Sequence, residues 1–152
     1  MTARFAYDVS LDPPAPVVPV RISGPVGEEA VMLPMLVDTG ADCTLVPAPI
    51  VRRLGLPQID VIGLTGVGGA KRQATVHAAA VELGGFRLLA RVVAFLDEAI
   101  LGRDVLNHAV VRLDGPGLAI TIGSRSRPQR SQARDSPEER RAPERPQGRR
   151  AG

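Results

Sequence analysis

The stretch Met35-Leu36-Val37-Asp38-Thr39-Gly40-Ala41-Asp42 decides the fold of this 152-residue chain. The apolar run from Val31 to Val37, interrupted only by Pro34, predicts a buried strand. The strand ends on an acid, a hydroxyl and a glycine, which together predict a tight turn that holds the carboxylate of Asp38 at the strand end. An Asp-Thr-Gly triplet occurs by chance in some chains of this length, so its meaning depends on what surrounds it.

The basic excess of the chain is confined to its C-terminal part. Of the 19 basic and 16 acidic residues, nine arginines and four acids lie in residues 124–152, which leaves ten basic and twelve acidic residues in the first 123. From Ser124 onward the sequence has no Val, Ile, Leu, Met or aromatic residue, so it cannot bury enough surface to fold and we expect it to be disordered. The sequence therefore divides into an N-terminal extension or edge strand (1–16), a folded domain (17–123) and a tail (124–152).

Cys43 is the only cysteine, which excludes an internal disulfide and fits a reducing compartment. The N-terminal residues lack the apolar segment of a signal peptide, and no stretch reaches 18 uncharged apolar residues. We expect a cytoplasmic protein without a membrane partner.

The rest of the pattern predicts short strands with two brief helices. Pro49 and Gly55 bracket a short helix from Pro49 to Leu54, and a second helical turn is expected from Gly102 to about His108. Residues 1–12 alternate like an edge strand, whereas the prolines that follow, Pro13, Pro14, Pro16 and Pro19, argue against a central strand. The other expected strands are Val17–Ser23, Ile59–Leu64, Arg72–Leu83, Phe86–Leu96, Ala99–Leu101, Val110–Leu113 and Leu118–Ile122. This spacing is typical of a mostly antiparallel β domain.

Three motifs follow one another in a particular order. The Asp38-to-Asp42 segment comes first, a glycine-rich hairpin tip at residues 65–69 comes next, and Ile100-Leu101-Gly102-Arg103-Asp104-Val105-Leu106 comes last. Their order and approximate spacing resemble those of the retropepsin-like aspartic proteases, over roughly residues 17–122. The resemblance implies a mostly β half-barrel of short antiparallel strands with one or two short helices.

The resemblance also implies a role for each motif. Asp38 would be the catalytic carboxylate, the Thr39 hydroxyl would bond across a dimer to the partner loop, and Gly40 would allow close backbone approach. Arg103 would pair with Asp42 and support the active-site loop. The implied substrate-binding residues are Ala41, Asp42 and the flap residues Gly66, Val67, Gly68 and Gly69.

Aspartic proteases need two carboxylates that share a proton, and this chain has one Asp-Thr-Gly. Asp114-Gly115 lacks the hydroxyl and the preceding strand end, so the second carboxylate must come from a second copy related by two-fold symmetry. The resemblance thus implies a homodimeric endopeptidase that hydrolyses peptide bonds by direct water attack and uses no cofactor. The alternative is a non-catalytic domain of the same fold that dimerises or holds extended peptides.

Simpler interpretations exist for each motif. Asp38 could cap an ordinary turn, and the glycine run could be a plain hairpin tip. A phosphate-binding loop is disfavoured because Lys71 follows Ala70 and precedes Arg72, which breaks the required Gly-Lys-Ser/Thr order.

The remaining candidate residues point less clearly to a function. Arg103 and Asp104 could be a solvated pair at a helix start. Cys43 is expected to fill a small buried space, with a redox role as the alternative. His77 and His108 lack further ligands at metal-binding spacing, so no metal site is predicted. The arginine-rich tail is expected to be a plain extension, with a weak, salt-sensitive contact to nucleic acid or acidic partners as the alternative.

Overall fold

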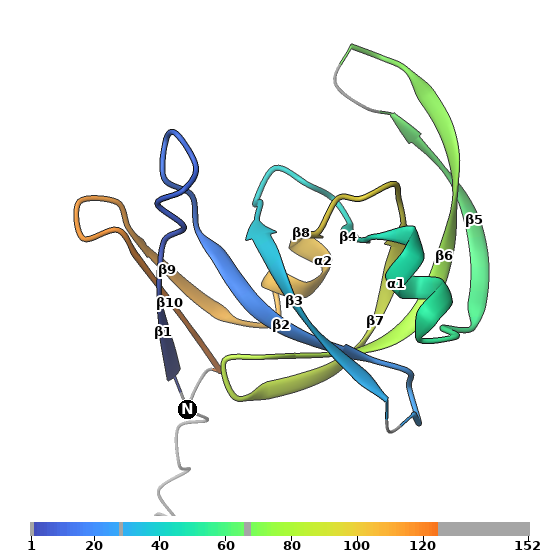
Figure 1. Cartoon of the computed structure of the whole chain (residues 1–152), viewed down its shortest axis with the longest axis horizontal. Helices are drawn as coiled ribbons and strands as arrows, with labels where there is room; N and C mark the ends of the chain where they lie inside the picture. The colour runs from blue at the N-terminus through green and yellow to red at the C-terminus, as the bar shows by residue number, and fades with distance from the viewer. Residues whose placement is uncertain (1, 28, 66–67, 125–152) are drawn as a thin grey trace, which may run out of the picture.

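A computed structural model describes residues 2–27, 29–65 and 68–124. The predicted flap residues Gly66 and Val67, and the tail beyond Ser124 with its predicted disorder and partner contact, lie outside the described residues. The elements in chain order are β1 (Thr2–Ala6), β2 (Val17–Ser23), β3 (Ala30–Val37), β4 (Thr44–Val46), α1 (Ala48–Arg53), β5 (Gln58–Thr65), β6 (Lys71–Leu83), β7 (Phe86–Ala94), β8 (Ile100–Leu101), α2 (Arg103–Leu106), β9 (Val110–Asp114) and β10 (Ala119–Gly123). The predicted mostly β fold with two short helices is confirmed (Figure 1).

Seven strands form one sheet that closes on itself. The strand order is β2-β3-β8-β4-β7-β6-β5, and β2 also pairs with β6, so that six strands complete a ring and β5 is added outside it. One edge of β6 serves two partners, because Lys71–His77 pair with β5 whereas Ala80–Glu82 pair with β2. Two pairings, β3 with β8 and β4 with β7, are parallel in an otherwise antiparallel sheet.

The core fills the inside of this ring, and β3 shows how it is built. Met35 and Val37 are buried, whereas Met32 is 61% exposed and Pro34 is exposed on the opposite face. The apolar run predicted a buried strand, and β3 is buried on its inner face, whereas no layer of the described chain covers its outer face. The fully buried side chains are largely β-branched or Leu and Met, and they include Val18, Val20, Ile22, Met35, Val46, Val81, Val92 and Leu101.

Pro19 lies within β2, although prolines in this region argued against a central strand. It faces Pro34 of β3, so neither residue of the opposed pair offers an N–H to the ladder. The pairing of β2 with β6 is limited to Arg21–Ser23, which leaves the other edge of β2 unpaired at Pro19. The proline is tolerated because this part of β2 is an edge.

A second, three-stranded sheet has the order β1-β10-β9 and is antiparallel throughout. In Figure 1 it lies on the left of the view, on the opposite side from the hairpin of β5 and β6. Its inner face contributes Ile120 and Ile122 to the core, and both are fully buried.

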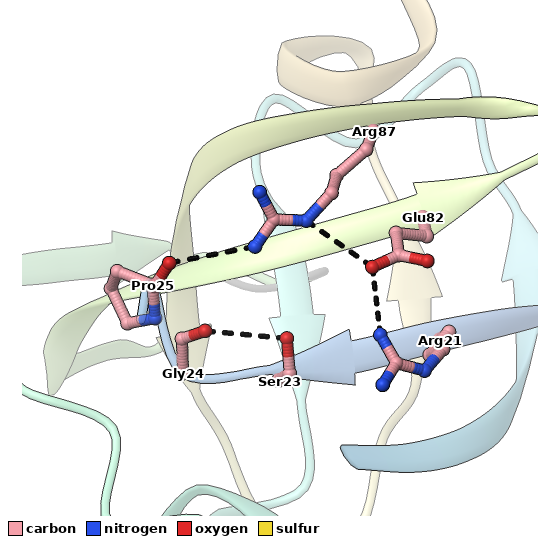
Figure 2. Close-up of polar contacts among 6 residues, drawn as sticks. All are labelled: Arg21, Ser23, Gly24, Pro25, Glu82 and Arg87. Atoms are coloured by element: carbon pink, nitrogen blue, oxygen red, sulfur yellow. Dashed lines mark hydrogen bonds and ion pairs between the residues drawn. The ribbon is translucent and has the colours of Figure 1, made fainter. Parts of the chain in front are cut away.

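A charged contact on the surface ties β2 to the hairpin of β6 and β7. Arg21 Nη1 lies 2.7 Å and Arg87 Nε lies 3.2 Å from the same Glu82 oxygen, and Arg87 also donates to the carbonyl of Pro25 at 3.4 Å (Figure 2). The side chains of Arg21 and Glu82 are 40% and 33% exposed, so solvent weakens the pair. The ring is therefore held mainly by its backbone pairing and its core.

Within the described residues no helix is long and apolar enough to cross a membrane.

Gly84, in the turn between β6 and β7, tests how closely the two sheets approach. Its φ is +56°, and a Cβ there would lie 2.8 Å from the carbonyl oxygen of Ile122. Gly55 has the same φ with no atom within 4 Å of such a Cβ, so it is a matched control. We expect Gly55→Ala to lower the free energy of unfolding by about 1 kcal/mol from backbone strain alone. Gly84→Ala should lower it by roughly 2 to 4 kcal/mol.

The two variants can be compared by chemical denaturation at equal protein concentration. Equal losses of stability would contradict this, because they would show that the backbone at Ile122 can move away from the added Cβ at no cost in free energy.

Candidate active site

Asp38 stands at the end of β3, where the predicted turn begins. Its backbone N–H donates to the carbonyl of Leu101 at 3.1 Å, which continues the parallel pairing of β3 with β8. Its Oδ1 accepts the N–H of Gly40 at 2.8 Å, and its carbonyl accepts the N–H of Ala41 at 3.3 Å. The side chain is partly exposed, so its carboxylate is held by the turn and still reachable from solvent.

Gly40 lies at a crowded point of this turn. A Cβ at position 40 would lie 3.1 Å from Oδ1 of Asp38, in the space where the carboxylate meets the backbone N–H. Thr39 is exposed, and its hydroxyl makes no hydrogen bond to another described residue.

The loop from Asp38 to Cys43 runs around β8, which lies between β3 and β4 in the sheet. A Cβ at Gly102 would lie only 2.4 Å from the carbonyl oxygen of Cys43, so only glycine permits this approach. Beside it, the N–H of Arg103 donates to the carbonyl of Ala41 at 3.0 Å. The first and third sequence motifs therefore meet in space.

Thr44 and Asp104 hold the two motifs together. Thr44 is fully buried, and its hydroxyl donates to Asp104 Oδ1 at 2.7 Å and accepts the N–H of Gly102 at 3.1 Å. The second oxygen of Asp104 accepts the N–H of Thr44 at 3.0 Å. Asp104 is therefore not the solvated partner of Arg103 that its place at a helix start suggested. The sequence feature that could have indicated this contact is a threonine at the start of a buried strand, because a buried hydroxyl needs a hydrogen-bond partner.

Arg103 pairs with Asp42, as the resemblance implied. The guanidinium donates to Asp42 Oδ1, and both side chains are exposed. The backbone N–H of Arg103 also donates to the carbonyl of Ala41. Arg103 therefore contacts the loop through both its side chain and its backbone.

The glycine-rich motif lies at the tip of the hairpin formed by β5 and β6, which projects at the upper right of Figure 1. Gly68 and Gly69 have φ of +89° and +79°, values that favour glycine, and both are exposed. The other two predicted flap residues, Gly66 and Val67, lie outside the described residues.

Cys43 is partly exposed rather than fully buried. Burial raises the pKa of its thiol above the ordinary value, and the nearby charge of Asp104 raises it further. A neutral thiol is a poor nucleophile, which argues against a redox role. Cys43 and Asp42, but not Asp38, line a hollow of about 320 Å³ against β7, into which Ile62 of β5 also faces.

The two histidines differ in burial: one is buried and hydrogen-bonded, and the other is exposed. His77 is buried, with Nδ1 2.8 Å from the carbonyl of Leu56 and Nε2 2.9 Å from the Thr75 hydroxyl, so its role is structural. His108 is exposed beside the hollow. Across the described part of the chain, no group of three His, Cys, Asp or Glu residues is placed to hold a metal ion.

Asp114 caps its own hairpin turn. Its Oδ1 accepts the N–H of Gly117 at 2.9 Å, in the connection between β9 and β10. This local bond explains the Asp-Gly at positions 114–115.

Comparison with known proteins identifies the family and the fold of the chain. A family model described as Aspartyl protease matches residues 18–124. No curated protein matches the chain. A retropepsin-like aspartic protease from Rickettsia conorii is similar in structure, with 19% identity, a TM-score of 0.54, and coverage of 82% of this chain and 91% of that one. The EIAV protease complexed with the inhibitor HBY-793 is 27% identical, with a TM-score of 0.48 and coverage of 61% of this chain and 86% of that one.

Replacing Thr44 with valine tests the bond that joins the motifs. The variant keeps the shape of the side chain but leaves the N–H of Gly102 without its acceptor and removes one of the donors to Asp104 Oδ1, so we expect a loss of about 2 kcal/mol in the free energy of unfolding. Thr65→Val, at an exposed position of β5, should change it by less than about 0.5 kcal/mol. Denaturation curves that shift equally for both would show that the buried hydroxyl contributes little.

The raised pKa of Cys43 predicts slow alkylation at mildly alkaline pH. Because less thiolate is present at a given pH, the midpoint of the rate against pH should lie higher in the folded chain than in the chain unfolded by denaturant. Comparing midpoints instead of absolute rates separates the pKa from steric shielding. A folded-state midpoint at or below the unfolded one would contradict the assignment.

Proposed function

The chain belongs to the aspartyl protease family, and we propose that it is an endopeptidase whose active site forms when two copies each contribute Asp38. The observation that carries the proposal is the position of this carboxylate. One of its oxygens accepts the N–H of Gly40, and the other accepts no hydrogen bond from a described residue. The carboxylate is thus oriented by its own backbone and has an oxygen available for a water or a partner.

A pair of such carboxylates supplies the chemistry of peptide hydrolysis. Two carboxylates at close distance do not both carry a charge, so one holds a proton and the other does not. The charged one takes a proton from water as the water oxygen bonds to the carbonyl carbon, and the protonated one gives its proton to the carbonyl oxygen. Collapse of the resulting diol breaks the C–N bond as the amide nitrogen receives a proton. No covalent intermediate with the enzyme is required.

The surrounding residues support the pair in the proposed dimer. The exposed Thr39 hydroxyl is free to bond to the partner's loop across the two-fold axis. Ala41 and Asp42 follow on the same loop, which Arg103 and Thr44 hold in place from behind. A loop fixed in this way keeps its carboxylate in position without the partner, which limits the cost of assembling the site.

The hairpin of β5 and β6 is proposed to act as the flap. Its tip, Gly66, Val67, Gly68 and Gly69, would close over a peptide that binds as an extended strand. Exposed glycines with positive φ suit a segment that must bend and bring its backbone close to a substrate.

Asp38→Asn tests the catalytic assignment. An amide cannot exchange the proton, so we expect cleavage of a peptide library to fall by about 10³-fold or more, without loss of folding. Asp60→Asn is the matched control. Asp60 is an exposed carboxylate on β5, and it pairs with Arg91 of β7. If the Asp38→Asn variant cleaves the library as well as wild type does, the catalytic assignment of Asp38 is wrong, whereas no cleavage by the wild-type dimer would favour the non-catalytic alternative.

Mixing the two proteins tests whether the site is shared. At a fixed amount of wild type, an excess of Asp38→Asn chains should lower cleavage, because mixed dimers hold one carboxylate. Undiminished cleavage after full subunit exchange would place both catalytic groups in one chain.

A further inference from the structure

The loop that joins β1 to β2, residues 7–16, lies beside the strand that ends at Asp38. The carbonyl of Pro16, at the end of the loop, accepts the N–H of Val37 at 2.9 Å, and Val37 immediately precedes Asp38. At the start of the loop, the N–H of Tyr7 donates at 2.8 Å to the carbonyl of the residue that precedes β10. The base of the loop is therefore attached to both sheets, next to the candidate catalytic turn.

The 7–16 loop lies at the same end of the molecule as the candidate catalytic turn. In Figure 1 it rises at the upper left, and the loop between β3 and β4, which begins at Asp38, lies next to it. The hairpin of β5 and β6 rises beyond that loop, at the upper right. A peptide that lies against Asp38 beneath this hairpin therefore comes close to the 7–16 loop.

Local bonds hold the 7–16 loop in shape. Asp8 and Ala15 exchange two backbone hydrogen bonds, of 2.8 and 3.2 Å. Oδ1 of Asp8 also accepts the N–H of Ser10 at 2.9 Å and its hydroxyl at 2.6 Å. These bonds from Ser10 lower the pKa of Asp8, so its carboxylate stays charged at a lower pH than that of a free aspartate. Pro13 and Pro14 restrict the backbone between these bonds.

The tip of the loop presents two apolar side chains to solvent. Val9 is 69% exposed and Leu11 is 45% exposed. Single exposed apolar residues are common on protein surfaces and indicate little by themselves. In this case a loop of fixed shape presents two of them beside a site that has to hold a peptide. A contact that is already ordered loses little conformational entropy when the peptide binds.

We propose that the 7–16 loop forms a second wall of the substrate cleft, and that Val9 and Leu11 contact an apolar side chain of the bound peptide. The proposal rests on the proposed function, because Asp38 defines where the peptide lies. The hairpin of β5 and β6 binds the main chain of the peptide, whereas these two residues select one of its side chains. Because a symmetric dimer presents the loop twice, the preference is expected once on each side of the bond that is cut.

Val26 provides a matched control for Val9. It is 99% exposed and lies in the connection that follows β2, whereas the 7–16 loop precedes β2. The seven residues of β2 separate the two ends by about 20 Å. Val9→Thr and Val26→Thr therefore make the same change, which conserves the shape of the side chain, at exposed positions on opposite ends of one strand. Leu11→Asn removes the second apolar group at similar size.

Cleavage by the full chain tests the contact with peptides that carry one leucine at successive positions of an otherwise constant, serine-rich sequence. At the contacted position, leucine in place of serine should lower the wild-type KM roughly tenfold. In the double variant Val9→Thr, Leu11→Asn this difference should shrink to about twofold with kcat unchanged, because the contact is equal in the bound substrate and in the transition state. Val26→Thr should keep the wild-type ratio.

The same peptides, carrying a fluorescent label, test the contact without catalysis. In the Asp38→Asn chain, fluorescence anisotropy gives the dissociation constants of the leucine and serine peptides. Their ratio should fall when Val9→Thr and Leu11→Asn are added, and it should stay unchanged when Val26→Thr is added. A ratio that falls in this way, without Asp38-dependent cleavage by wild type, would support the loop contact and contradict the proposed function.

Other outcomes would overturn the loop contact and leave the protease assignment intact. The first is a leucine preference that the double variant retains in cleavage and in binding, and the second is a wild-type chain without any such preference. The third is a KM that rises equally for every peptide, because the loop would then act on the fold or on assembly. A double variant with a weaker dimer by mass and an unchanged preference would assign the loop to the second copy instead.

Discussion

A buried threonine hydroxyl joins the two segments that build the site. Thr44 has no exposed surface, and its hydroxyl bonds both Asp104 and the N–H of Gly102. Because the hydroxyl is buried, its loss would leave the N–H of Gly102 without its acceptor, whereas Asp104 would keep the N–H groups of Thr44 and Val105. The loop that carries Asp38 ends at this residue, and α2 begins beside it. The geometry of the carboxylate thus depends on a contact between residues sixty positions apart.

Much of the fold could be predicted because its strands are short and sharply bounded. Val17–Ser23 is found with both ends as expected, and Pro49 and Gly55 mark the first helix to within a residue because each suits one position of a helix end. The closure of the ring could not be predicted. It depends on β8 lying between β3, to which it is parallel, and β4, to which it is antiparallel, and on the pairing of β2 with β6. No periodicity within a strand encodes its neighbour. The missing cover on the outer face of β3 has the same cause.

The candidate site was predictable to a different degree in each part. Asp38, Thr39 and Gly40 are contiguous, so a strand followed by a turn is enough to place them together. The pair of Asp42 and Arg103 spans most of the domain and was reached through the resemblance to a family, which carries spatial information that one sequence lacks. Asp104 was misread because a carboxylate near a helix start is usually solvated, and only its distant partner Thr44 shows otherwise.

The thirteen residues of β6 belong to two environments. Lys71, Arg72 and Gln73 are exposed in the projecting hairpin, whereas Ala79, Ala80 and Val81 are fully buried between β7 and β2. His77 stands at the boundary, beside an irregularity in the pairing at Gln58 and Asp60. The exposed end of β6 at Lys71–Gln73 therefore packs against fewer groups than its buried continuation, so less free energy is needed to open it locally. In the proposed function, this one strand would supply both the part of the hairpin that covers a substrate and the anchor that holds it to the ring.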